Sequence, residues 1–127
     1  MNESPILNKK DYKEESVFKP ENLLRESRRQ NALPECEIPE ICLLDPDGDI
    51  VSYLKKQDRI SQDPCWAGYH TTMYDFELGD QTIGVIGEAV GASFAVLIAE
   101  QMFVSGCELL ISITSAGTIS PPPDGER

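Results

Sequence analysis

Two apolar runs flank a helical pattern in the second half of the chain. Residues 82–86 and 109–114 are short runs of apolar and β-branched residues, and residues 92–105 between them have an apolar helical pattern. A glycine-spaced turn over 87–91 joins the first run to the helix. The pattern predicts a strand–helix–strand unit with parallel strands. The loops that follow both strands then lie at one edge of the sheet, where ligands bind in open α/β folds.

The helix and second strand of this unit carry more specific expectations. Most of the circumference of the 92–105 helix is apolar, which predicts packing on more than one side, with Glu100 and Gln101 on its polar side. Gly106 is expected to end the helix in a left-handed turn. The 109–114 run lacks strict alternation, which is typical of an interior parallel strand.

Shorter elements are predicted in the first half. Pro20 suits the first turn of a helix over 21–31, and a solvated face is favoured over a ligand site for its arginines. The apolar run over 40–44 predicts a buried strand. A helix then covers 50–56, with Asp49 as its N-cap.

An aromatic stretch precedes the strand–helix–strand unit. A polar connection over 58–64 leads to residues 66–76, which are rich in aromatic and β-branched residues and predict one strand. Gly79-Asp80 predicts a hairpin turn into the next strand. His70 lies within the aromatic stretch, and a hydrogen-bonded imidazole beside the sheet is favoured over a catalytic one.

The elements together predict an α/β fold with a partial mixed or parallel sheet flanked by helices. The 127 residues are enough for one domain. Residues 1–39 are expected to form an arm, a short helix and a linker, residues 40–119 the folded unit, and residues 120–127 a Pro-rich tail.

The charge of the chain excludes two classes of partner. Eleven Lys and Arg stand against 22 Asp and Glu, which gives a formal net charge of −11. Nucleic-acid and anionic-membrane binding both need excess positive charge, so neither partner is expected. The longest apolar run, residues 94–99, is too short to span a bilayer.

The cysteine pattern indicates reduced thiols. Cys36, Cys42, Cys65 and Cys107 form no C-x-x-C pair, and His70 is the single histidine, so no metal site is expected. We expect a cytoplasmic protein whose cysteines are free.

Two loops carry candidate chemistry. Gly87-x-x-x-Gly91 precedes a helix, where backbone amides can hold an anion, although glycines used for tight packing explain the motif equally well. The motif is neither a dinucleotide-binding nor a Walker sequence. The Asp45-to-Asp49 stretch lacks the ligand spacing of a calcium loop and predicts a turn.

The order of these pieces resembles the nucleoside phosphorylase family, which includes purine nucleoside and uridine phosphorylases and related nucleosidases. The resemblance covers residues 41–119 and is strongest over 84–91 and 106–117. It implies binding of a purine or pyrimidine nucleoside, with phosphate as a possible co-substrate, no other cofactor, and a homo-oligomeric state. The substrate-binding residues that it implies are Gly48, Asp49, Gly87, Glu88, Gly91, Ser115, Ala116 and Gly117.

Two positions depart from the phosphorylases of this family. They place an arginine where this chain has Ser52, and another where it has Ser112. A phosphate dianion needs such charge-assisted donors, so hydrolysis or nucleoside binding becomes comparatively more plausible than phosphorolysis.

The family's catalytic domain is also about twice this size. Its later half supplies the ribose-binding glutamate and the acid that protonates the base. The resemblance implies cleavage of the N-glycosidic bond as the family reaction. For this chain, as a truncated N-terminal half, it implies weak or no turnover and leaves its catalytic residues unknown; the alternative is a non-catalytic nucleoside-binding or assembly module.

Overall fold

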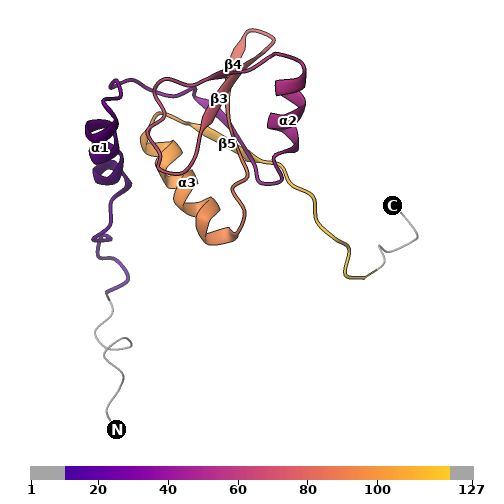
Figure 1. Cartoon of the computed structure of the whole chain (residues 1–127). Coiled ribbons are helices and arrows are strands. Elements are labelled where there is room, and N and C mark those ends of the chain that lie inside the picture. The colour runs from indigo at the N-terminus through magenta and orange to yellow at the C-terminus, as the bar shows by residue number, and fades with distance from the viewer. Residues whose placement is uncertain (1–10, 121–127) are drawn as a thin grey trace.

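The computed structural model of the chain describes residues 11–120. The start of the expected N-terminal arm, residues 1–10, and all but the first residue of the expected Pro-rich tail lie outside the described residues. Within 11–120 the fold is α/β, with a five-stranded mixed sheet and helices on both of its faces (Figure 1).

Three helices and five strands make up this fold. The helices are α1 (Pro20–Asn31), α2 (Asp49–Lys56) and α3 (Ala92–Val104). The strands are β1 (Ile41–Asp45), β2 (Ser61–Gln62), β3 (Met73–Leu78), β4 (Gln81–Gly87) and β5 (Leu109–Ser112), and their order in the sheet is β2-β3-β4-β1-β5.

Strand β1 lies between the two strands of the predicted strand–helix–strand unit. It pairs in parallel with β4 on one side and with β5 on the other. Asp45 aligns with Gly87, and Leu44 aligns with Ser112, so the three strands end at the same edge of the sheet. The prediction that the two loops share an edge is confirmed.

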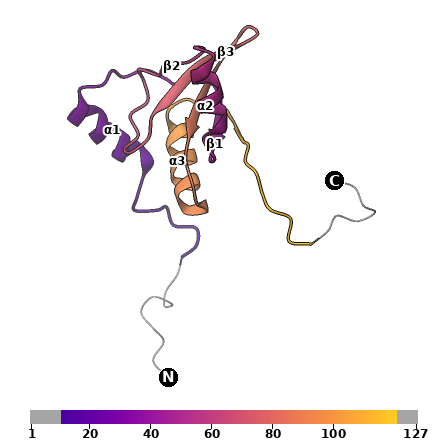
Figure 2. The ribbon, with the colours of Figure 1, turned by 45° about the vertical axis from the view of Figure 1, so that its right-hand side comes forward.

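The two faces of the sheet bury separate apolar clusters. On one face, α2 contributes Val51 and Leu54, which pack with the buried Val85 of β4. On the other face, α3 contributes Ile98 and Met102. Figures 1 and 2 show α1 beside α3, away from α2, and these two helices contact each other.

The start of α2 differs from the expectation at one residue. Gly48, not Asp49, is the N-cap, with a left-handed φ of 78°, and Asp49 is the first helical residue. The capping contact comes from further back, because Oδ2 of the buried Asp45 accepts the N–H of Val51 at 3.0 Å. The turn, α2 and β1 are otherwise as predicted.

The strand predicted over 66–76 is wrong at its start. Strand β3 begins at Met73, and residues 66–72 form a loop in which His70 has a positive φ of 62°. Trp66 is buried in this loop and its indole N–H donates to Thr71 Oγ1 at 3.0 Å. The short strand β2, within the predicted polar connection, was missed.

Strand β5 was predicted in the interior and instead lies at an edge of the sheet. It ends at Ser112, and Leu109 and Ile111 are 52% and 41% exposed. The uninterrupted apolar run is typical of an interior strand, but within residues 11–120 no strand pairs with the outer side of β5.

Helix α3 packs on the sheet through Ile98 and Met102 and also contacts α1, so the expected packing on more than one side is confirmed. Val96 and Phe103, on the remaining side, are exposed. Gln101 lies on the buried side, not on the polar side, and its side-chain Oε1 has no hydrogen-bond partner among them. Gly106 has the expected positive φ, 119°.

A disulfide corrects the expectation of four free thiols. Cys36, after α1, is bonded to Cys65, in the loop before β3, across a sequence separation of 29. Cys42 and Cys107 are free and buried. Burial raises the pKa of the Cys42 thiol, and also that of Cys107.

A pair of carboxyl groups lies on the α3 side of the sheet. Asp63 is buried and its Oδ1 accepts the N–H groups of Cys65 and Trp66, at 2.7 and 2.9 Å. Burial, together with a hydrogen bond and charge repulsion from Asp63, raises the pKa of Asp75 on β3 to about 7. Two neighbouring carboxylates resist ionising together, so the pair retains a proton near neutral pH.

The raised pKa of Asp75 should make the parent protein lose stability as the pH rises, and we expect Asp75→Asn to remove this loss. The folded protein keeps a proton that the unfolded chain releases, so stability is lost between about pH 4 and 7. Asparagine cannot ionise, so the variant should be more stable than the parent at high pH. Urea unfolding at about pH 4, 6 and 8 measures this. Asp80→Asn, on the exposed hairpin turn, is the matched control and should keep the fall; an unchanged slope in Asp75→Asn would contradict the prediction.

Candidate functional site

A cleft of about 270 Å³ lies at the edge where β1 and β4 end. Its walls come from α2, from the loop before β3, from the residues that follow β4, and from the start of α3. The residues that line it are Gly48, Val51, Ser52, Lys55, His70, Thr71, Thr72, Tyr74, Gly87, Glu88 and Phe94.

Asp45 joins three of the segments around this cleft. Its backbone carbonyl accepts the N–H groups of Gly48 and Glu88, both at 2.9 Å, while its carboxylate binds the N–H of Val51. A buried carboxylate and a buried carbonyl must both find donors. The turn before α2 and the turn after β4 are therefore held to the end of β1.

Close packing explains why glycine stands at two positions. A Cβ on Gly48 would lie 3.1 Å from Cγ of Glu88, and a Cβ on Gly87 would lie 3.1 Å from Cγ2 of Val51. Gly48 also has a left-handed φ. A side chain at either position would therefore require its neighbour to shift by a few tenths of an ångström.

Three of the eight predicted substrate-binding residues line the cleft: Gly48, Gly87 and Glu88. The residues that do not line it are Asp49, Gly91, Ser115, Ala116 and Gly117. Gly91 is the N-cap of α3, and a Cβ there or on Gly117 would meet no atom within 4 Å, so neither glycine is required by packing.

Ser115 is engaged by a carboxylate of the chain itself. Asp47 Oδ2 accepts the backbone N–H of Ser115 at 2.9 Å, its hydroxyl at 3.0 Å, and the hydroxyl of Thr114 at 3.2 Å. These hydrogen bonds, first that of the Ser115 N–H, lower the pKa of Asp47. The donors expected to face phosphate thus already bind an anionic oxygen.

The sequence reasoning missed most of the side chains in the cleft. Lys55 lies one turn after Ser52 on α2, and its Nζ is 4.7 Å from the ring centre of Tyr74. The three-residue spacing places Ser52 and Lys55 on one face of the helix, which is the signal that could have identified the lysine. His70, Thr71 and Thr72 carried no such signal, because a loop positions them.

Two residues of the cleft have strained backbones. His70 and Glu88 have φ values of 62° and 63°, in the left-handed region that side chains other than glycine rarely adopt. Such strain persists only where the surrounding structure enforces it, and it often accompanies a functional site. Both residues border the cleft from different segments.

Two further observations concern only residues 11–120. No group of three or more His, Cys, Asp or Glu is arranged to hold a metal ion. No helix there combines the length and the apolarity needed to cross a membrane.

Comparisons with protein-family models, with curated proteins and with solved structures found no match.

We expect Gly48→Ala to destabilise the protein more than Gly79→Ala does. Both glycines have a positive φ, but a Cβ on Gly79 meets no atom within 4 Å, whereas one on Gly48 meets Glu88. Each substitution places a side chain at a positive φ, which costs about 1–2 kcal/mol of stability at either position. At Gly48 the contact with Glu88 adds to this cost. Denaturant unfolding of both variants gives the difference, and equal losses of stability would show that the two turns are not closely packed.

Proposed function

We propose that the cleft binds a nucleoside and that the chain is a nucleoside phosphorylase-like protein, whose family reaction is cleavage of the N-glycosidic bond. The observation that carries this proposal is the convergence of Gly48, Gly87 and Glu88 on one cleft at the ends of parallel strands. Ligands of open α/β sheets bind at this kind of edge.

The side chains of the cleft suit the two halves of a nucleoside. Tyr74 and Phe94 offer aromatic surface to a planar base. The hydroxyl groups of Ser52, Thr71 and Thr72 can exchange hydrogen bonds with a sugar. A polar, partly aromatic cleft of this kind supports nucleoside binding without deciding between purine and pyrimidine.

The charges in the cleft support binding more than they support phosphorolysis. Lys55 is its one Lys or Arg side chain within the described residues, and Glu88 adds a carboxylate that repels a phosphate dianion. We therefore propose weak or no turnover by this chain. A non-catalytic nucleoside-binding module is the second candidate, favoured by the serine at position 52.

We expect adenosine, inosine or uridine to bind, and Phe94→Leu to weaken the binding by about tenfold, because base stacking on an aromatic ring is lost. Phe103→Leu is the matched control, since Phe103 lies on the same helix, is exposed and is remote from the cleft lining. Titration calorimetry measures binding. Chromatographic assay of free base, with and without phosphate, should show little release.

Absence of binding by all three nucleosides would overturn the proposal, as would an equal effect of the two leucine variants. Rapid release of base would instead overturn the non-catalytic alternative and the expectation of weak turnover. Release only with phosphate would identify phosphorolysis.

We also propose that copies of the chain associate through β5. Its outer edge is unpaired within residues 11–120, and its exposed Leu109 and Ile111 add apolar surface. An unprotected edge strand readily pairs with another strand, and two antiparallel copies of one edge form a symmetric contact.

We expect Ile111→Lys to shift the chain toward the monomer, because a charge on an edge strand opposes pairing. Light scattering after size-exclusion chromatography, over a range of concentrations, measures the mass. Val17→Lys is the matched control, since Val17 is fully exposed and outside the sheet. A parent chain that is monomeric at every concentration would contradict the proposal.

A further inference from the structure

We propose that the Cys36–Cys65 disulfide is a redox-sensitive brace that holds the loop over residues 65–72 against α1 and thereby positions one wall of the cleft. This inference concerns regulation of the site and rests on the proposed function for its biological meaning. Whether the Cys36–Cys65 disulfide positions this wall of the cleft can be tested without a nucleoside.

The bond joins two segments that are remote in sequence. Cys36 follows α1, whereas Cys65 begins the loop that leads to the cleft, and their Cα atoms lie 5.2 Å apart. Cys36 is exposed and Cys65 is 8% exposed. A reductant therefore reaches the bond from the side of Cys36.

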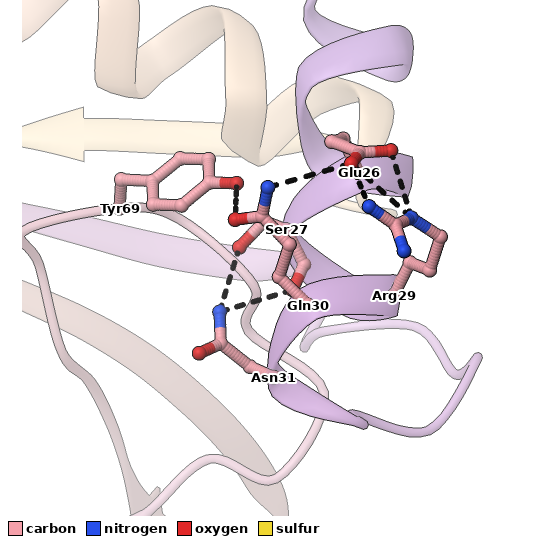
Figure 3. A network of polar contacts seen from close by, with 6 residues as sticks. All are labelled: Glu26, Ser27, Arg29, Gln30, Asn31 and Tyr69. Carbon is pink, nitrogen blue, oxygen red and sulfur yellow. Dashed lines mark hydrogen bonds and ion pairs between the residues drawn. The ribbon is translucent and has the colours of Figure 1, made fainter.

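Hydrogen bonds reinforce the contact between α1 and the loop. Arg28 donates to the carbonyl of Cys65 at 3.3 Å, and the Ser27 hydroxyl donates to the carbonyl of Ala67. The Tyr69 hydroxyl donates to Gln30 Oε1 at 2.8 Å, and Figure 3 shows the ring of Tyr69 directed at α1. Each of these bonds crosses from the helix to residues 65–69.

Within α1, the residues that meet the loop are themselves tied together. Asn31 donates to the Ser27 carbonyl at 3.0 Å, and Gln30 donates to Glu26 at 3.4 Å, while Glu26 pairs with Arg29 (Figure 3). The Arg29 guanidinium lowers the pKa of Glu26, which keeps this carboxylate charged. The helix therefore presents an ordered surface to the loop.

The same loop reaches the cleft through Trp66. This side chain is 6% exposed, and its indole N–H donates to Thr71 Oγ1, while Asp63 holds its backbone N–H. Thr71, together with His70 and Thr72, lines the cleft. A chain of direct contacts thus runs from the disulfide, through Cys65 and Trp66, to the wall.

Reduction requires an external dithiol, and the exchange balances with it. A thiolate of the dithiol attacks the sulfur of Cys36, the S–S bond breaks, and Cys65 leaves as a thiolate that takes up a proton. The second thiol of the dithiol resolves the mixed disulfide and releases Cys36. The dithiol loses two electrons and two protons, and the two cysteines gain them.

The other cysteines are poorly suited to compete in this exchange. Cys42 and Cys107 are buried, and burial raises the pKa of both thiols, which suppresses the reactive thiolate. Exchange is therefore directed to the Cys36–Cys65 bond.

The test compares the oxidised chain, the chain reduced with dithiothreitol, and Cys36→Ser with and without dithiothreitol. We expect amide hydrogen exchange over residues 66–72 to become about tenfold faster on reduction, with little change in β1 and β4. The fluorescence of Trp66, the one tryptophan of the chain, should shift to longer wavelength. Cys36→Ser should give the exchange rates and fluorescence of the reduced chain, and dithiothreitol should change neither.

Thiol titration in denaturant is run alongside, and it should count two more thiols after reduction. Unchanged exchange over 66–72 despite the two new thiols would overturn the brace, and so would four free thiols in the chain before reduction. An adenosine titration of the two redox states forms a separate arm. Failure of adenosine, and of inosine and uridine in the same titration, to bind either state overturns the nucleoside proposal and leaves the brace supported by the exchange data.

Discussion

The buried end of β1 needs hydrogen-bond donors, and this need organises the edge of the sheet that carries the cleft. Asp45 is 2% exposed, and the N–H groups that it accepts come from the turn before α2, from α2 itself and from the turn after β4. An unpaired carboxylate in such a position would be strongly destabilising. One residue therefore holds three segments to the end of β1, and these segments border the cleft.

The parts of the fold that follow from local chemistry were predictable. Pro20 at the start of α1, the apolar run of β1 and the glycines that flank α3 each specify their element through backbone geometry. The shared edge of β4 and β5 follows from the parallel direction of two strands that are joined by a crossover helix. These features need no knowledge of distant contacts.

The parts that failed depend on contacts between remote segments. Residues 66–72 have the composition of a strand, yet they form a loop in which Ala67 and Tyr69 are hydrogen-bonded to α1 and Trp66 is buried. The disulfide could not be derived from four cysteines without C-x-x-C spacing. The glycine turns of the cleft were predictable because backbone geometry specifies them locally. The cleft side chains of residues 70–72 were not predictable, because a loop positions them.

Charged side chains near the cleft have different roles, although the chain as a whole is acidic. Asp47 occupies the Ser115 donors, so this carboxylate stabilises a loop, whereas Lys55 sits against Tyr74 and faces the cleft. A sequence with twice as many acidic as basic residues, 22 against 11, thus still presents a cation at its candidate site. Net charge describes the long-range field, and the local arrangement decides what a cleft accepts.

The turn of the β3–β4 hairpin is a suitable position for attaching a tag or label. Its turn at Gly79 has open space around it and lies at the end of β4 opposite to Gly87 and the cleft. Exposed turns of this kind accept inserted sequence well. A tag or label placed there would anchor the chain to a surface with its cleft facing the solution.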